Sequence, residues 1–178
     1  TINLATAIRI TNPFITIAGQ TAPGGGVLLR GTSLTDYAMI LVYAHDVVIR
    51  YLRVRKGYSP NSPAGAQLGT GLFVSQNANN VVLDHNSVSW TQDENTTVWG
   101  NSGTPHDITF SWNLLAEGLS GHATALITGS NDAGVPDNMQ NIDFHHNLVM
   151  NDSHRMPLMK NKSTRIVNNI FYNWSFYA

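Results

Sequence analysis

Five segments of the chain repeat one pattern, and this repeat limits the possible folds more than any other feature. Each segment has a polar first residue, an alternating apolar stretch, a short polar break and a second apolar pair. The breaks lie 34, 27, 34 and 22 residues apart. A period of this length that varies by insertion indicates one superhelical coil per repeat. The segments are residues 46–54, 80–88, 107–115, 141–149 and 163–171.

The break of each repeat holds a residue that should stack on its counterparts. Leu52 stands there in the first segment, and the other four have Asn86, Asn113, Asn147 and Asn169. Amides at one phase of stacked coils can hydrogen-bond from coil to coil, as in other stacked β structures. We also expect these Asn to adopt the left-handed backbone of a corner, which Asn tolerates.

The repeat therefore predicts an all-β fold, a right-handed, single-stranded parallel β-helix of about six to seven coils. Residues 14–18, 27–30, 39–42 and 71–74 are expected as further strands. We expect one domain over residues 1–178, without terminal caps or coils. A β-sandwich is the alternative, but antiparallel hairpins would not place Asn at the same phase four times.

Composition agrees with many short strands and excludes several classes of protein. Charged residues make up only 12% of the chain, and Asn, Thr and Ser carry the polarity instead. The net charge of −1 gives no basic surface for nucleic acid. The absence of cysteine excludes disulfides and zinc–thiolate sites. No apolar run approaches the ~20 residues that a membrane-spanning helix needs.

Several motifs of the chain resemble those of a known enzyme family. They are IAGQTAPG at 17–24, VIRYLRVR at 48–55, LDHNSVSW at 83–90, HHNL at 145–148 and RMP at 155–157. In this order and spacing they resemble bacterial pectate lyases of polysaccharide lyase family 1, over about residues 10–174. The resemblance implies a parallel β-helix that cleaves polygalacturonate by β-elimination, usually with calcium. It also implies a secreted or periplasmic, monomeric protein.

The resemblance assigns roles to particular residues of this chain. Arg155 matches the proton-abstracting Arg of the family, and the alternative is a surface Arg paired to Asp152. Lys160 stands where the family has a second basic residue that grips the substrate carboxylate. His122 resembles a His of a related bacterial subgroup, and Asp93 matches a calcium-ligand carboxylate. The catalytic candidates are thus Arg155, Lys160 and His122, with Asp93 as the metal ligand.

The expected metal set is incomplete. Further family carboxylates would fall on Gly69 to Gly71 and on Thr97, and a family Lys near Leu119 or Ser120 is absent. Ca²⁺ takes 6 to 8 oxygens. We therefore expect calcium to bind weakly or with help from substrate carboxylates.

Spacing from the Asn ladder predicts that three of these residues share one groove. Asp93 lies 7 residues after Asn86, His122 lies 9 after Asn113, and Arg155 lies 8 after Asn147. Equal phase on consecutive coils puts them on one face, about 4.8 Å apart per coil.

Other side chains are given less specific roles. We expect Trp99 and Glu117 to contact substrate beside Lys160, and most Trp residues to be buried. Strand alternation should point Glu94 away from Asp93 and separate His145 from His146, so that the two His could not bind one metal.

The leading functional interpretation is a lyase that acts on an acidic plant polysaccharide, polygalacturonate or a related uronan. A non-catalytic, carbohydrate-binding β-helix with a degenerate metal site is the first alternative. A glycoside hydrolase is the second, but it would need clustered carboxylates, and Asp93 with Glu94 and Glu117 are the nearest approach to a cluster.

Overall fold

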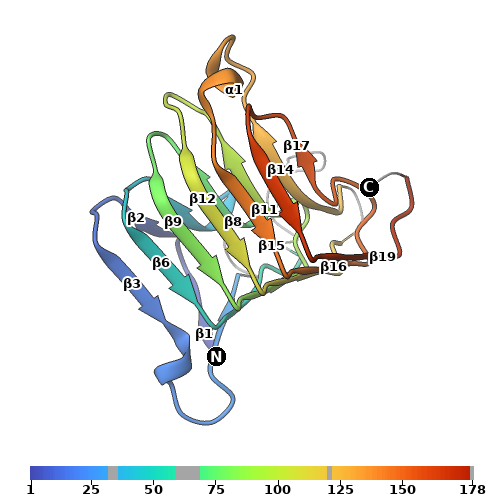
Figure 1. Cartoon of the computed structure of the whole chain (residues 1–178). Coiled ribbons are helices and arrows are strands. Elements are labelled where there is room, and N and C mark those ends of the chain that lie inside the picture. The colour runs from blue at the N-terminus through green and yellow to red at the C-terminus, as the bar shows by residue number, and fades with distance from the viewer. Residues whose placement is uncertain (32–35, 59–68, 120–121, 177–178) are drawn as a thin grey trace.

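The alternating apolar stretches of the repeat form short strands, and each pairs with the same strand of the next coil. The computed structural model describes residues 1–31, 36–58, 69–119 and 122–176. Within these residues nineteen strands form three sheets, in which neighbouring strands are parallel. Consecutive strands enter the three sheets in turn, so three strands make one coil of a β-helix (Figure 1).

The three sheets are named here A, B and C. Sheet A contains β1 (Ile2–Asn3), β4 (Val27–Arg30), β7 (Leu52–Arg55), β10 (Ser87–Ser89), β13 (Leu114–Ala116), β16 (Leu148–Met150) and β19 (Ile170–Tyr172). Sheet B contains β2 (Ile8–Ile10), β5 (Ala38–Val42), β8 (Thr70–Ser75), β11 (Glu94–Trp99), β14 (Thr124–Gly129) and β17 (Leu158–Met159). Sheet C contains β3 (Ile15–Ala18), β6 (Val47–Arg50), β9 (Asn79–Asp84), β12 (His106–Ser111), β15 (Ile142–His145) and β18 (Thr164–Val167).

This topology confirms the predicted parallel β-helix. The strands make six sets of three, and β19 opens a further set. The strands expected from the early part of the chain are present as β3, β4, β5 and β8. Helix is limited to a 3₁₀ turn (Gly19–Thr21) and α1 (Val135–Asn138) within the described residues. Neither helix is long and apolar enough to cross a membrane.

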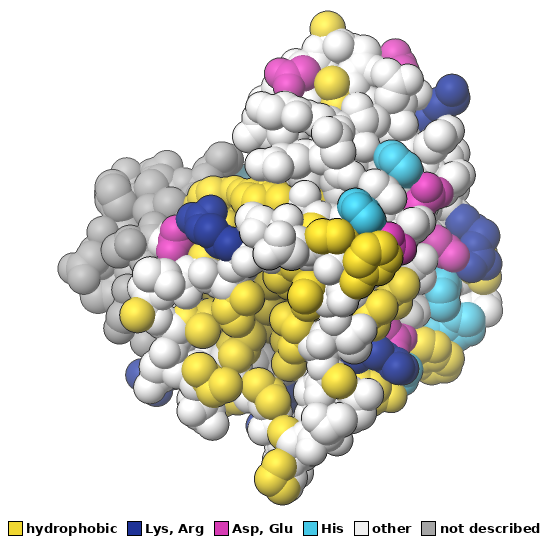
Figure 2. Space-filling view, turned by 90° about the vertical axis from the view of Figure 1, so that its left-hand side faces the viewer, with side chains coloured by type: hydrophobic (Ala, Val, Ile, Leu, Met, Phe, Trp, Pro, Cys, Tyr) yellow, Lys and Arg dark blue, Asp and Glu magenta, His cyan; other side chains and the backbone are white. Residues whose placement is uncertain are grey.

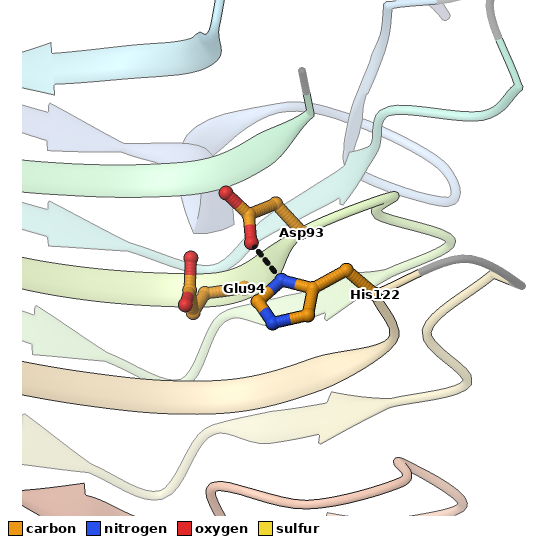
Figure 3. Close-up of side chains that lie close together, drawn as sticks. All are labelled: Asp93, Glu94 and His122. Atoms are coloured by element: carbon orange, nitrogen blue, oxygen red, sulfur yellow. Dashed lines mark hydrogen bonds and ion pairs between the residues drawn. The ribbon is translucent and has the colours of Figure 1, made fainter. Parts of the chain in front are cut away.

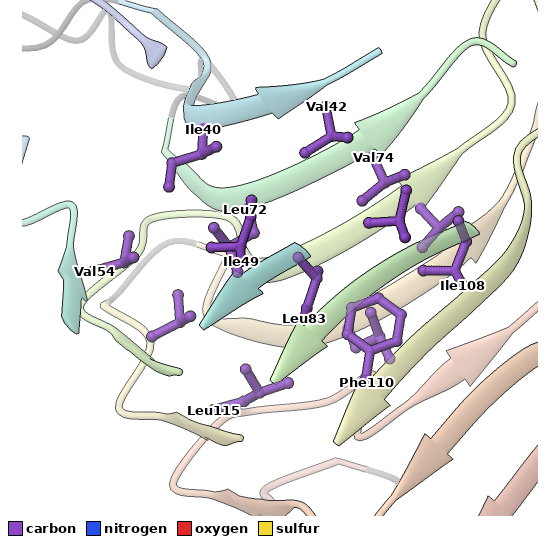
Figure 4. Packing of buried hydrophobic residues seen from close by; sticks show 14 of the residues in the cluster. Ile40, Val42, Ile49, Val54, Leu72, Val74, Leu83, Ile108, Phe110 and Leu115 are labelled. Atoms are coloured by element: carbon purple, nitrogen blue, oxygen red, sulfur yellow. The ribbon is translucent and has the colours of Figure 1, made fainter. Parts of the chain in front are cut away.

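Apolar side chains of equal phase stack into columns inside the helix. In sheet C, Ile49 pairs with Leu83, Leu83 with Phe110, and Phe110 with Phe144, and all four are buried. Figure 4 shows the first three of these with the matching residues of the other sheets, which fill one continuous interior. Figure 2 faces the first coil, where hydrophobic side chains gather on the surface.

The four Asn form the predicted ladder along one inner corner. The side-chain Oδ1 of Asn113 accepts the backbone N–H of Asn86 at 2.9 Å, and Oδ1 of Asn147 accepts that of Asn113 at 2.9 Å. Asn169 Oδ1 accepts the backbone N–H of Asn147 at 2.8 Å, and Asn86 Oδ1 accepts that of Leu52 at 3.1 Å. The ladder thus satisfies the buried backbone donors of a corner that lacks strand pairing.

The left-handed backbone lies one residue earlier than predicted. Positive φ angles occur at His85 (55°), Trp112 (56°), His146 (56°) and Asn168 (56°), each directly before a ladder Asn. The expectation that the Asn themselves are left-handed was wrong, because the preceding residue turns the chain. This turn leaves each Asn side chain directed inward, where its amide can bond to both neighbouring coils.

Candidate functional site

A groove of about 570 Å³ runs over the outer face of sheet B. One column of residues forms part of its lining: Phe73 pairs with Thr97, Thr97 with Ile127, and Ile127 with Leu158. The remaining lining residues are Tyr37, Thr70, Asp93, Glu94, Trp99, Asn101, Asn131, Arg155 and Lys160. Charged and aromatic side chains thus share a surface that four successive coils build.

Asp93, Glu94 and His122 cluster in this region (Figure 3). His122 Nδ1 lies 2.6 Å from Asp93 Oδ1, and one ligand atom from each of the three residues lies within 4.8 Å of the others. The prediction that Glu94 points away from Asp93 was wrong. Asp93 precedes β11 and Glu94 is its first residue, so regular strand alternation does not separate their side chains.

Burial of two adjacent carboxyls changes the protonation of the cluster. The pKa of Glu94 is raised to about 7, mainly by burial and also by the neighbouring Asp93, and the charge of Arg155 opposes this rise. Both carboxyls are largely hidden from solvent, with 11% of the Asp93 side chain and 7% of the Glu94 side chain exposed. Crowded, desolvated carboxyls of this kind are stabilised by a bound cation.

Arg155 lies on the coil that follows His122 and reaches into the same cluster. Its guanidinium donates to Glu94 Oε1 as an ion pair. Arg155 has a φ of 56°, a left-handed backbone that directs its side chain out of strand alternation. Asp93 and Arg155 therefore line one groove as their spacing predicted, whereas His122 contacts Asp93 without being among the lining residues, and the partner of Arg155 is Glu94.

Asp152, the alternative partner for Arg155, belongs to a separate buried network. Its Oδ1 accepts the backbone N–H of Gly118 at 2.7 Å, and its Oδ2 accepts Asn95 Nδ2 at 2.9 Å. Asn95 Oδ1 in turn accepts the hydroxyl of Thr91 at 2.9 Å. This network fixes β11 against the two following coils, next to the cluster.

The free energy of unfolding should fall between about pH 4 and pH 6 because of Asp152. Burial raises the pKa of Asp152 from 3.8 to about 6, so the folded state holds this proton more tightly than the unfolded state. The stabilisation is complete below the unfolded pKa and is lost as pH rises through the folded one, by up to about 3 kcal/mol. Urea unfolding across this range measures the slope. Asp152→Asn should reduce the slope, with the remainder due to Glu94, whose pKa is also raised, and an unchanged slope in that variant would assign the whole effect to other groups.

Lys160 and Trp99 occupy the other end of the groove. Lys160 Nζ lies over the Trp99 ring, 5.7 Å from its centroid. Gly129 pairs with Trp99 and leaves the space that both side chains use, since a Cβ there would lie 2.9 Å from the Cβ of Lys160. The two substrate-binding candidates are thus held together as a cation on an aromatic face.

Glu117, the third substrate-binding candidate, is not among the described residues that line the groove. It accepts Trp90 Nε1 at 3.0 Å on another corner. Trp90, Trp112 and Trp174 are all exposed, so the prediction that most Trp residues are buried was wrong. They lie on the outside of corners, where the coil turns and no neighbouring layer covers them.

The sequence did not reveal that Glu94 belongs to the cluster or that apolar residues line the groove. The phase of Phe73, Ile127 and Leu158 in the repeat could have identified them, because all stand at an outward position of sheet B. The backbone at Gly71 leaves no room for a carboxylate side chain, since a Cβ there would lie 2.3 Å from Val88 Cγ1.

The outer groove of this β-helix is lined by two neighbouring carboxyls and two cations, and a His contacts one of the carboxyls. The chain is 32% identical to a probable pectate lyase C of Emericella nidulans over 160 residues, which is 90% of this chain and 32% of that protein. It is 30% identical to a probable pectate lyase C of Aspergillus fumigatus, over 90% of the chain and 33% of that protein. Pectate lyase 2 of Pectobacterium atrosepticum is 28% identical, over 82% of the chain and 39% of that protein.

The chain is thus similar in sequence to fungal and bacterial proteins named pectate lyase. It spans about a third of the length of the fungal relatives that it matches. No family model matches the chain, and no solved structure matches it significantly.

Proposed function

We propose that the groove on sheet B is the active site of a polysaccharide lyase that cleaves polygalacturonate or a related uronan by β-elimination. The observation that carries the proposal is the convergence of Asp93, Glu94, His122 and Arg155 from three coils. The names of the relatives support the same activity. The substrate is an acidic plant polysaccharide, and the protein acts as a secreted or periplasmic monomer.

β-Elimination from a uronate sets three tasks. Charge on the C6 carboxylate must be neutralised so that the C5 proton becomes acidic, a base must remove this proton, and a donor must assist the leaving O4 oxygen. Lys160 binds the carboxylate from its place over Trp99. Both line the groove with Arg155, so a polysaccharide that lies along the groove would pass all three.

Arg155 takes the C5 proton in this mechanism, as the family resemblance implies. Free Arg is effectively never deprotonated, so this role depends on unusual surroundings. The ion pair with Glu94 positions the guanidinium but favours its protonated form, so Arg155 must first give a proton to a solvent hydroxide before it can take the C5 proton. His122 supplies the proton for O4 as an imidazolium, whose Nδ1–H donates to Asp93 and whose Nε2–H is the proton that O4 receives.

Calcium fits the carboxyl end of the groove in part. Asp93 and Glu94 supply oxygens, and the hydroxyl of Thr97 lies 3.5 Å from Glu94 Oε2. Ca²⁺ takes 6 to 8 oxygens, so most of the remainder must come from substrate and water. When bound there, the ion would neutralise the C6 carboxylate and acidify C5.

Calcium binding to the sugar-free protein should be weaker than about 10⁻⁴ M, because too few protein oxygens converge. Titration calorimetry with CaCl₂ measures the affinity, first alone and then with an oligogalacturonate that should tighten it. Asp93→Asn should abolish the residual binding. A tight stoichiometric site in the absence of sugar would mean that other residues hold the ion.

The product distinguishes the proposed lyase from the two alternatives. Lyase action on polygalacturonate creates an unsaturated uronate that absorbs in the near ultraviolet. Hydrolysis creates only reducing ends, and a binding module creates neither. We expect near-ultraviolet absorbance to rise in step with reducing ends. Reducing ends without absorbance, or neither signal on any uronan, would contradict the proposal.

A further inference from the structure

A row of ring side chains lies on the outside of the corner between sheets C and A. The rings of Tyr51 and His85 stack at 4.6 Å, those of His85 and Trp112 at 5.9 Å, and those of Trp112 and His146 at 4.6 Å. Each pair is within 18° of parallel. Trp112 therefore covers one face of the His146 ring and fixes its orientation.

The left-handed residues of the corners also bring neighbouring side chains together. A residue and the left-handed residue that follows it do not alternate as strand residues do, so both side chains leave on the same side. Three such pairs join a His Nδ1 to a carboxylate: His45 with Asp46 at 2.6 Å, His106 with Asp107 at 2.6 Å, and His85 with Asp84 at 2.8 Å.

At one corner both members of the pair are His. His145 ends β15 and His146 is the left-handed residue, and their Nδ1 atoms lie 2.8 Å apart. The prediction that these two His point to opposite faces was wrong, because it assumed a regular strand. Both residues are only partly buried.

The 2.8 Å contact joins two atoms that can each present a lone pair. Without an ion, one Nδ1–H donates to the other Nδ1. If both Nδ1 atoms are unprotonated, both can bind one ion that lies about 2.0–2.1 Å from each. Asn168 Nδ2 lies 3.3 Å from His146 Nε2, and a flip of this amide places its oxygen there to accept the Nε2–H that the chelating tautomer requires.

We propose that His145 and His146 chelate a divalent transition-metal ion through their two Nδ1 atoms, with Asn168 orienting His146. Imidazole pairs suit Cu²⁺, Ni²⁺ and Zn²⁺, with Cu²⁺ bound most tightly, whereas Ca²⁺ and Mg²⁺ take oxygen ligands. A hollow of about 360 Å³, whose lining includes Trp112, His146 and Asn168, lies beside the His146 ring. This site is independent of the groove on sheet B.

Cu²⁺ titration of the untagged protein tests the site, followed by calorimetry and by electron paramagnetic resonance, which counts coordinated nitrogens. All proteins should carry His122→Asn, so that the imidazole of the groove cannot contribute. The test variants are His145→Asn and His146→Asn. Asn suits the second position because Asn168 has the same left-handed backbone at the same corner, so the fold should be preserved.

His85→Asn is the matched control, since His85 has the same backbone and the same ring stack but a carboxylate partner. We expect one Cu²⁺ equivalent with two coordinated imidazole nitrogens, lost in both test variants and kept in the control. Asn168→Ala should weaken binding about tenfold. Retention of the two-nitrogen signal in either test variant, or its loss in the control, would overturn the proposal.

Discussion

Arg155→Lys is expected to lower turnover on polygalacturonate by about 10²-fold or more while sugar binding stays nearly unchanged. Lys keeps the positive charge but loses the planar fork that contacts Glu94 and faces the groove. Initial rates of unsaturated-product formation at alkaline pH with calcium measure turnover. Calorimetry with an oligogalacturonate measures binding.

Arg165→Lys is the matched control for this substitution. Arg165 lies on β18 of sheet C, where it pairs with Asp143 at 2.5 Å, and it does not line the groove. Its replacement should leave the rate within a factor of about two. Equal rates for wild type and Arg155→Lys would remove Arg155 from the mechanism and leave His122 as the candidate base.

Asn113→Ala should lower the free energy of unfolding by about 2–4 kcal/mol. Asn113 Oδ1 accepts the backbone N–H and the Nδ2 of Asn86 at 2.9 and 3.2 Å. Its Nδ2 donates to the Leu83 carbonyl at 2.8 Å and to Asn147 Oδ1 at 3.1 Å. The substitution would leave several buried polar groups in two neighbouring coils without partners.

Chemical denaturation followed by circular dichroism measures this loss. Asn138→Ala is the control, because Asn138 is exposed on α1 and makes one bond, to the Gly134 carbonyl at 3.2 Å. Its replacement should change stability by no more than about 0.5 kcal/mol. A loss below about 1 kcal/mol in Asn113→Ala would mean that the ladder does not hold the coils together.

The coil architecture could be predicted from sequence because two separate features of the repeat indicate it. The apolar alternation marks the strands, and the Asn at one phase marks the corner that joins sheets C and A. A local period of two identifies inward positions such as Leu83 and Phe110 without knowledge of the partner strand. The Asn ladder could be predicted from the repeat alone, since residues at one phase stack in any solenoid.

The corners themselves could not be predicted in detail. A left-handed residue precedes the break residue of each repeat, and its type varies: Tyr51, His85, Trp112, His146 and Asn168 all occupy this place. Residue type therefore gives little sign of this backbone. Strand alternation was assumed through the corner, and this led to the wrong directions for His145 and His146.

The site was predicted in part for the same reason. Asp93, His122 and Arg155 were found because their spacing from the ladder is nearly constant, and Lys160 and Trp99 meet in the same groove. Glu94 was given the wrong direction because it stands at the first residue of a strand. Glu117 lies elsewhere because it turns at the end of sheet A and bonds to Trp90.

A crystal structure of Arg155→Lys with Ca²⁺ and an oligogalacturonate tests the central claim most directly, since slow turnover should keep the sugar intact. We expect the sugar to lie in the groove on sheet B, with one C6 carboxylate near Lys160 and an ion on Asp93. Ordered sugar on another face, with the groove empty, would contradict the account.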